Sequence, residues 1–230
     1  MLKDVSVNKV FWVAILLVLN PAFSETAESD GFFYGRIGAG TFSINDIAFS
    51  SSATAYGVTV TAAGDLSFDT GYSASGAVGY RINKNLDAEL ELGYAESEYD
   101  QVKGTLNATY SGTTYTVSGS ANVDGKVQMF SGMGNLIYKF TDSQSFTPYL
   151  GGGIGLVRIV DSIDKIGTLT VNGEETNTDI AANLIAGFDM PLSDSAKAGL
   201  RYRYFWADTG SKGIDDATAH ALMATAVINF

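Results

Sequence analysis

The strongest signal in this chain is an alternation of apolar and other residues with a period of two. The clearest case is the segment 218–230, where Leu222, Ile228 and Phe230 fall on one face. Segments 196–208 and 86–95 alternate in the same way. Successive side chains of a β-strand point to opposite faces of a sheet, so this period predicts strands.

Eight segments of this kind can be traced, each about as long as a strand that crosses a membrane in a barrel. Their predicted bounds are 31–42, 68–82, 86–96, 126–140, 146–160, 179–190, 195–208 and 218–230. Short connections alternate with long loops near 43–67, 97–125, 161–178 and 209–217. The first two long loops either present an irregular surface or continue as β-extensions, since 113–118 has the composition of a strand.

The first 24 residues have the order of a secretory signal peptide: basic, then apolar, then small. The apolar run 10–19 is too short to cross a bilayer as a helix, which needs about 20 residues. An N-terminal membrane anchor is the weaker alternative. We predict cleavage before Glu25, which leaves 25–230 as a single domain.

The two faces of the predicted strands differ in a way that distinguishes a membrane barrel from a soluble β-sandwich. The apolar faces end in aromatic residues, as membrane-interface girdles do. We place five aromatics there: Tyr94, Phe140, Tyr202, Tyr204 and Trp206. The other faces carry charges sorted by strand, and we predict a charge network inside the lumen: Arg36, Arg81, Asp87, Glu89, Glu91, Lys197, Arg201 and Arg203. Only a closed barrel pairs every strand in hydrocarbon, so we predict an eight-stranded antiparallel transmembrane up-and-down β-barrel.

Several segments resemble the small outer-membrane β-barrel family, which includes the OmpA membrane domain, OmpX-like proteins, Opa-like adhesins and surface antigens of intracellular bacteria. They are residues 31–40, 79–91, 147–155 and 199–204. The resemblance covers the chain after the signal peptide and implies a location in the bacterial outer membrane. Its motifs are specific for fold and poor for function, because they are features of a barrel wall.

The C-terminus carries a further resemblance. Phe230, with Ile228 and Leu222 in phase, is similar to the signal that the barrel assembly machinery reads. We therefore expect that machinery as a partner during biogenesis.

Composition and charge exclude several classes of function. The chain has 25 acidic and 14 basic residues, a formal net charge of −11, which argues against nucleic acid as a partner. It has one histidine and no cysteine, so structural zinc and thiol catalysis are excluded and no cofactor is predicted. The lone His220 has no evident serine and acid partners, so we interpret it as a girdle residue and predict no enzyme activity.

The lumen charges allow two interpretations. An eight-stranded barrel is just wide enough for its own side chains to fill, so paired charges would pack the lumen. Alternatively, the pairs switch and open a narrow pore. Glu89 and Glu91 share one face, as a glycosidase pair would, but no sugar could enter a filled lumen.

These observations predict a non-enzymatic surface antigen, adhesin-like or structural barrel that acts through its extracellular loops. The alternative is a narrow porin-like channel for small solutes. A lipid enzyme is a third possibility, without a visible nucleophile. The expected partners are outer-membrane lipid and a host or neighbouring surface, with divalent cations at the acidic loops left open. We expect a monomer.

Overall fold

The computed structural model describes residues 31–140, 145–207 and 217–230, and the regular structure in them is β-strand. No helix in this part of the chain is long and apolar enough to cross a membrane. The predicted signal peptide lies outside the described residues. The strands are β1 (Phe33–Ile44), β2 (Ile47–Ala55), β3 (Val58–Phe68), β4 (Gly71–Arg81), β5 (Leu86–Tyr110), β6 (Thr113–Lys139), β7 (Thr147–Ile166), β8 (Leu169–Pro191), β9 (Ala196–Ala207) and β10 (Ala217–Asn229).

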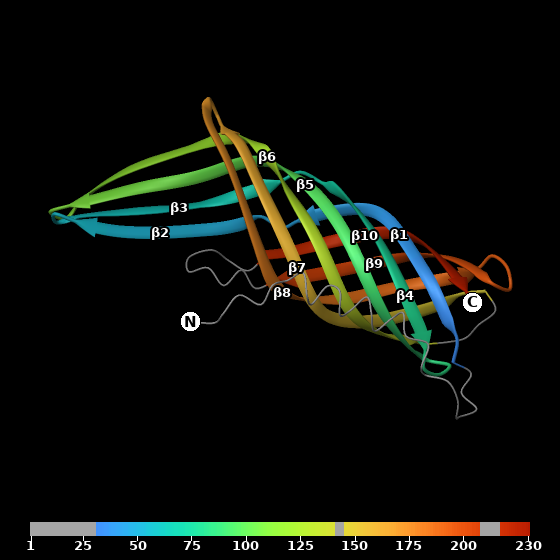
Figure 1. Cartoon of the computed structure of the whole chain (residues 1–230). Coiled ribbons are helices and arrows are strands. Elements are labelled where there is room, and N and C mark those ends of the chain that lie inside the picture. The colour runs from blue at the N-terminus through green and yellow to red at the C-terminus, as the bar shows by residue number, and fades with distance from the viewer. Residues whose placement is uncertain (1–30, 141–144, 208–216) are drawn as a thin grey trace, which may run out of the picture.

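Eight of the described strands close into a ring. Their order is β1, β4, β5, β6, β7, β8, β9 and β10, each antiparallel to the next, and β10 pairs with β1. The short turns β4–β5 and β8–β9 lie at the same end of the ring as the C-terminus (Figure 1). The predicted eight-stranded antiparallel ring is confirmed.

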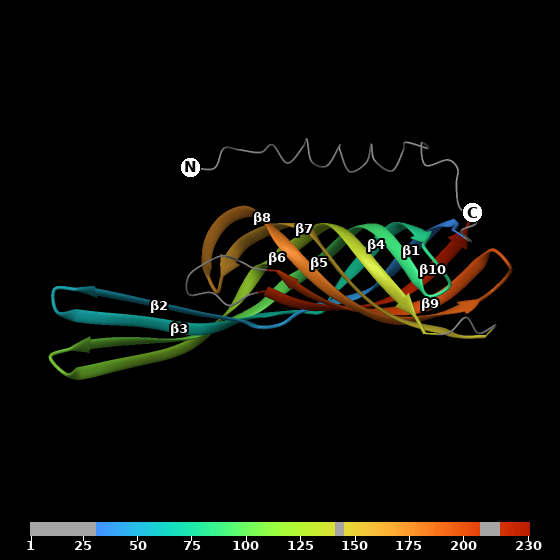
Figure 2. The same cartoon turned by 90° about the horizontal axis from the view of Figure 1, so that it is seen from below.

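The remaining two strands build a sheet that projects beyond the other end of the ring (Figure 2). β2 pairs with β3, β3 pairs with the outer part of β5, and that part of β5 pairs with the outer part of β6. We call this four-stranded sheet the extension; it comprises residues 47–68 and 101–122. Of the two forms left open for the first two long loops, the structure has the β-extension.

The strands are longer than the sequence analysis expected. The third predicted strand ends at residue 96, whereas the corresponding β5 continues to Tyr110. The fourth predicted strand begins at residue 126, whereas the corresponding β6 begins at Thr113. Most of the predicted loop at 161–178 is likewise strand, in β7 and β8. The apolar outward residues that marked the predicted ends stop there, but the ladder of backbone hydrogen bonds continues through residues of high β-propensity such as Thr, Val and Tyr.

The two hairpin tips of the extension have the backbone that such turns require. Tyr56 and Gly57 have φ of 52° and 77°, and Ser111 and Gly112 have φ of 48° and 81°. A type I′ turn has positive φ at both central residues and matches the twist of the flanking strands. Both hairpins are therefore closed by two-residue turns, with Ala55 opposite Val58 in the first.

The predicted inward and outward faces are confirmed for β5, β9 and β10, and β6 alternates in the same way. On β6, Asn135 and Lys139 are 3% and 4% exposed, whereas Leu136 and Tyr138 are 56% and 50% exposed. The interior of the ring is therefore lined by one residue in two along each strand, as the pleat requires.

Gly79 offers a test of how tightly this interior is packed. A Cβ added to Gly79 would lie 2.1 Å from Cζ of the buried Tyr34 ring, whereas one added to Gly76, on the same strand, meets no atom within 4 Å. We expect Gly79→Ala to lower the free energy of unfolding by about 1–3 kcal/mol, the usual cost of overpacking. Urea unfolding in lipid vesicles, followed by tryptophan fluorescence, measures this.

Gly76→Ala is the matched control, with an expected change within about 0.5 kcal/mol. Equal effects of the two substitutions would contradict a close-packed interior at Gly79.

Candidate functional site

A network of buried charges fills the half of the ring nearest the short turns. Period-two alternation points these side chains inward from β1, β4, β5, β6, β8 and β9. Five basic residues there meet four carboxylates, and all nine are at most 9% exposed. We call these residues the charge network: Arg36, Arg81, Lys139, Arg201, Arg203, Asp87, Glu89, Glu91 and Asp189.

Glu89 is the centre of the charge network. Arg201 donates to both of its carboxylate oxygens, from Nη1 at 2.9 Å and Nη2 at 3.0 Å. Arg36 Nε donates at 3.0 Å, and the Tyr34 hydroxyl donates at 2.9 Å. A carboxylate with four such donors is well compensated for the loss of water.

Three further carboxylates extend the network around Glu89: Asp189, Glu91 and Asp87. Arg36 binds Asp189 as a fork, with Nη1–Oδ1 at 2.8 Å and Nη2–Oδ2 at 2.9 Å. Glu91 accepts from Arg201 at 3.1 Å and from Arg203 at 2.6 Å. Nearer the short turns, Asp87 pairs with Arg81 Nε at 3.0 Å and with the Lys139 ammonium.

Aromatic rings hold the guanidinium groups of the network in place. The Tyr149 ring lies 5.4 Å from the Arg36 guanidinium and 5.5 Å from that of Arg201. Arg201 Nε also donates to the Tyr149 hydroxyl at 3.2 Å. Such contacts with a desolvated cation add to the ion pairs and fix the position of the planar group.

The structure brings together seven of the eight residues predicted for the network. The exception is Lys197, which makes no ion pair among the described residues. Asp189 and Lys139 were missing from the predicted set. The available signal was phase: Lys139 alternates with the outward Tyr138, and Asp189 alternates with Phe188 and Met190.

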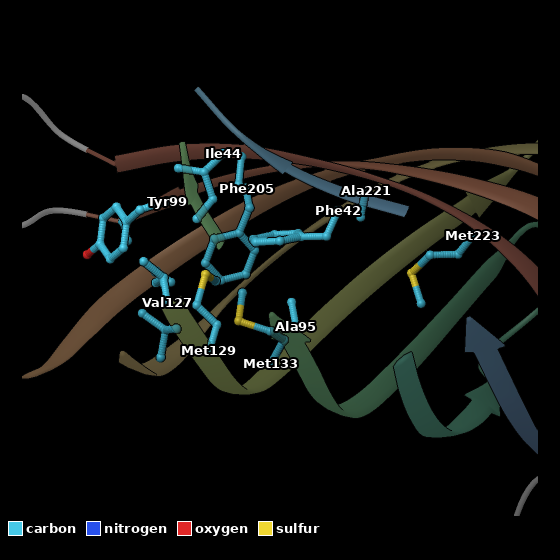
Figure 3. Packing of buried hydrophobic residues seen from close by; sticks show 14 of the residues in the cluster. Phe42, Ile44, Ala95, Tyr99, Val127, Met129, Met133, Phe205, Ala221 and Met223 are labelled. Atoms are coloured by element: carbon cyan, nitrogen blue, oxygen red, sulfur yellow. The ribbon is translucent and has the colours of Figure 1, made fainter. Parts of the chain in front are cut away.

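A layer of apolar side chains fills the other half of the ring, towards the extension. Phe42, Phe205, Met129 and Met133 point toward one another there (Figure 3). The alternation along the chain gave no indication of this layer. All its members are at most 9% exposed: Phe42, Ile44, Ala95, Tyr99, Val123, Val127, Met129, Met133, Val157, Ala181, Phe205, Ala207, Ala219, Ala221 and Met223.

A small gap lies between the two layers. Its volume is about 30 Å³, and Arg203, Phe205 and Met223 are among its lining residues. The buried Nε of Arg203 has no hydrogen-bond partner there. The gap has room for about one water molecule, which could satisfy this donor. The described lumen is therefore filled by its own side chains.

The outer wall carries aromatics near both ends. Tyr202 and Trp206 are 40% and 37% exposed, and Phe140, at the opposite end, is 51% exposed. Tyr94 and Tyr204 also lie on outward positions. The predicted outward orientation is right for all five aromatics, and for Leu222, Ile228 and Phe230 on β10 and at its end.

The lone histidine belongs to this wall. His220 packs against the rings of Tyr202 and Tyr204, with centroids 5.9 Å and 5.1 Å away, and its Nδ1 is hydrogen-bonded to the Tyr202 hydroxyl. It therefore lies among outward-facing tyrosines, and its role at a membrane interface stays a prediction. Within the described residues, no group of three or more His, Cys, Asp or Glu is arranged to hold a metal ion.

The extension has two chemically different faces. Its cross-strand rows on one face, from the ring towards the tip, are Ile47, Leu66, Val102, Ala121; Phe49, Gly64, Gly104, Gly119; Ser51, Ala62, Leu106, Val117; Ala53, Val60, Ala108, Tyr115; and Ala55, Val58, Tyr110, Thr113. We call this the apolar face. The intervening positions form the hydroxyl face, where hydrogen bonds join Thr54 to Thr59, Thr109 to Thr114, Thr105 to Ser118 and Thr116 to Asn107.

The hydroxyl face has a shallow groove of about 990 Å³, where Ser50, Asp65, Lys103 and Thr105 are among the lining residues.

At the base of the extension, the half-buried Asp161 accepts a hydrogen bond from Tyr99 at 3.0 Å. Burial raises the pKa of the Asp161 carboxyl and the pKa of the Tyr99 hydroxyl above their ordinary values.

Comparisons with known proteins agree with this architecture. A family model described as "Outer membrane protein beta-barrel domain" matches residues 12–230. An uncharacterized protein of Brucella abortus (strain 2308) is 28% identical over 163 residues, which cover 64% of this chain and 55% of that protein. RP828 of Rickettsia prowazekii (strain Madrid E), named as a candidate adhesin, is 26% identical over 134 residues, which cover 58% of this chain and 56% of RP828. The chain thus spans roughly half the length of these curated relatives.

Among solved structures, the crystal structure of Neisserial surface protein A is similar with a TM-score of 0.50 and 18% sequence identity. The match covers 86% of this chain and 97% of that one. At this identity the likeness shows the fold alone.

The central arginine of the charge network gives a direct test of its energetic role. Arg201→Gln would remove the guanidinium that bridges two buried carboxylates, with two of the four donors to Glu89 and one of the donors to Glu91. We expect it to lower the free energy of unfolding by about 3–5 kcal/mol in vesicles, as for other broken buried ion pairs.

The matched control is Lys126→Gln, which removes an ion pair of 3.3 Å whose lysine side chain is 45% exposed. Exposed pairs contribute at most about 1 kcal/mol. If Arg201→Gln cost as little as Lys126→Gln, the charge network would not be what stabilises the filled lumen.

Proposed function

Because the chain belongs to the family of the outer membrane protein beta-barrel domain, we propose that it is an adhesin-like interaction protein that acts at the cell surface through its extension. Its location is the bacterial outer membrane. The observation that carries the proposal is the contrast between a filled lumen and a protruding sheet. The inward side chains of the described ring residues are buried against one another, whereas the extension presents two large exposed faces.

The outer wall supports a placement of the ring across the membrane. Between its aromatic ends, the outward positions of the described ring strands carry no Asp, Glu, Lys or Arg. On β4, Tyr72 and Tyr80 mark the two ends. Their eight-residue separation corresponds to about 26 Å along the strand at about 3.3 Å per residue, or about 20 Å along the barrel axis at the usual tilt. This is close to the roughly 25 Å apolar band of such barrels.

The charged outward residues give the barrel an orientation. Glu96, Lys126 and Arg158 follow the apolar band on the side of the extension. Short turns face the periplasm in barrels of this class, and long connections face outward. The proposal therefore places the extension outside the cell and the chain termini on the periplasmic side.

The remaining sequence predictions belong to this proposal. The signal peptide 1–24 directs export, and Leu222, Ile228 and Phe230 are presented to the barrel assembly machinery. The mature protein is a monomer within its own membrane, in contact with outer-membrane lipid. It carries no enzyme activity, and its ligand is a host or neighbouring surface.

A narrow channel is the alternative function, and the filled lumen argues against it. We expect the barrel in planar bilayers to show no conductance steps, because the charge network and the apolar layer leave no continuous water path. Glu89→Ala and Arg203→Ala are recorded beside it. Steps whose size changes with these substitutions would place the channel ahead of the interaction protein.

Removal of the extension tests the interaction function itself. A trimmed variant replaces residues 47–66 with a short Gly-Ser linker and 102–121 with Asn-Gly, which closes the register pair Gln101–Asn122 as a hairpin. We expect bacteria that display this variant to lose adherence to cultured epithelial cells, while the heat-dependent gel mobility of a folded barrel is retained. Undiminished adherence would overturn the proposal.

A further inference from the structure

The apolar face of the extension is exposed and has no charged residue. Leu106 and Val117, in the central row, are 48% and 68% exposed, and Tyr115 in the next row is 69% exposed. Its base is anchored: Ile47, Leu66 and Val102 pack against the apolar layer inside the ring. Above this base, nothing in the described part of the chain covers the face.

The size of this face fits a specific interface. Four strands at about 4.8 Å spacing are about 19 Å wide, and the rows span about 27 Å along β2. The flat area is thus about 500 Å², in the upper part of the roughly 300–600 Å² that the largest, often functional, apolar patch of a soluble monomer covers. Two such faces in contact would bury about 1,000 Å², which is the lower limit of a specific protein–protein interface.

The pattern of large and small residues on the face is complementary to itself. A two-fold axis that lies along the central row, perpendicular to the strands, brings two copies face to face. In this arrangement the hairpin tips of the two extensions point in opposite directions. Each strand then faces its own counterpart, so Leu106 faces Leu106 and Val117 faces Val117. Tyr115 of each copy faces Gly119 of the other, where a Cβ would meet no atom within 4 Å.

The same axis pairs the two rows beside the centre along the other strands. Ala108 of each copy faces Gly104 of the other, and Ala53 faces Phe49. Each of the two aromatic rings in these rows, Tyr115 and Phe49, thus faces a small residue, as close packing between two sheets requires.

Lipid is the weaker candidate for this face. Surfaces that lie on membranes usually combine an apolar face with Lys and Arg on the opposite face. Here the opposite face is mostly hydroxyl groups, with Lys103 beside Asp65 in register. A chain with net charge −11 is also repelled by anionic membrane surfaces. An uncharged face, by contrast, lets two acidic copies meet without direct repulsion.

We propose that the apolar face of the extension binds the same face of a second copy presented by an opposing membrane. This rests on the proposed surface location and names the partner. The apolar face continues the inner wall of the ring, so it looks towards the space above its own barrel. A second copy in the same membrane could reach this face only if its barrel occupied the place of the first barrel. The second copy must therefore belong to an opposing membrane. Reversed tips place the two barrels at opposite ends of the contact.

Vesicle clustering tests the contact. The barrel is reconstituted in phosphatidylcholine vesicles, and clustering is followed by light scattering. Wild type should cluster, and Val117→Asp should abolish clustering because it places a charge at the centre of the contact. Thr116→Asp is the matched control: it adds the same charge one residue away, on the hydroxyl face, and should cluster as wild type does.

Differently labelled empty vesicles in the same mixture identify the occupant. Their exclusion from the clusters is expected, since the contact needs protein on both sides. Their recruitment would show that the face binds lipid and would overturn the proposal. Clustering by Val117→Asp equal to that of wild type, or no clustering by wild type, would overturn it as well.

Cross-linking tests the position of the two-fold axis. The chain has no cysteine, so Leu106→Cys introduces a single thiol at the proposed centre. A short bismaleimide should link this variant into dimers between vesicles, and should not link Asn107→Cys, whose thiol lies on the hydroxyl face. Equal yields from both variants would contradict the face-to-face contact.

The two proposals fail separately. Loss of adherence in the trimmed variant, together with absence of clustering by wild type, would leave the interaction function in place and remove the second copy as partner. Clustering through the apolar face, together with unchanged adherence in the trimmed variant, would do the reverse.

Discussion

The pairing of β1 with β10 is the contact on which the rest of the molecule depends. It runs from Tyr34–Asn229 to Ile44–Ala219 and leaves no free edge in the ring. In hydrocarbon, each unpaired backbone group would cost several kcal/mol, so only a closed ring is stable there. Closure also separates the residues of every strand into an inner and an outer set. The interior of an eight-stranded ring is too narrow for bulk water, so its side chains must satisfy one another.

The interior meets this demand in two different ways. Near the short turns, five basic side chains and four carboxylates compensate each other's loss of water, with Glu89 accepting from two arginines and Tyr34. Towards the extension, mainly Phe, Met, Val and Ala fill the same cross-section. The charged layer confers specificity of packing, since a guanidinium fork accepts few geometries. The apolar layer blocks the lumen on the side of the extension. Rearrangement of the ion pairs would therefore not by itself open a pore.

The sequence predicted which side chains point into the ring wherever the alternation shows which positions are outward. The inward set on β5, β9 and β10, including Glu89 and Arg201, follows from counting residues in twos. Asp189 was missed because a single acid among Phe188, Gly187 and Met190 gives little sign of a partner on β1. The length of β5 and β6 could not be read either. On β5, a register shift between Glu98 and Gln101 reverses the phase of the alternation, so its outer segment does not continue the pattern that identifies the wall. On β6 the phase continues from the inward Val127 to Val117 on the apolar face, but the outward positions beyond Phe130 are no longer apolar.

The same rule that builds the barrel also explains the extension. Beyond the register shift, alternation continues, but there is no lumen to fill and no lipid to face. A sheet whose two sides both met water would be free to carry polar residues on both. Instead Thr, Ser and Asn gather on one side and Val, Leu, Ala and Tyr on the other. Covering an exposed apolar side chain lowers the free energy of the system. The segregation is therefore best explained by a partner surface that is itself a β-sheet with apolar residues on one face.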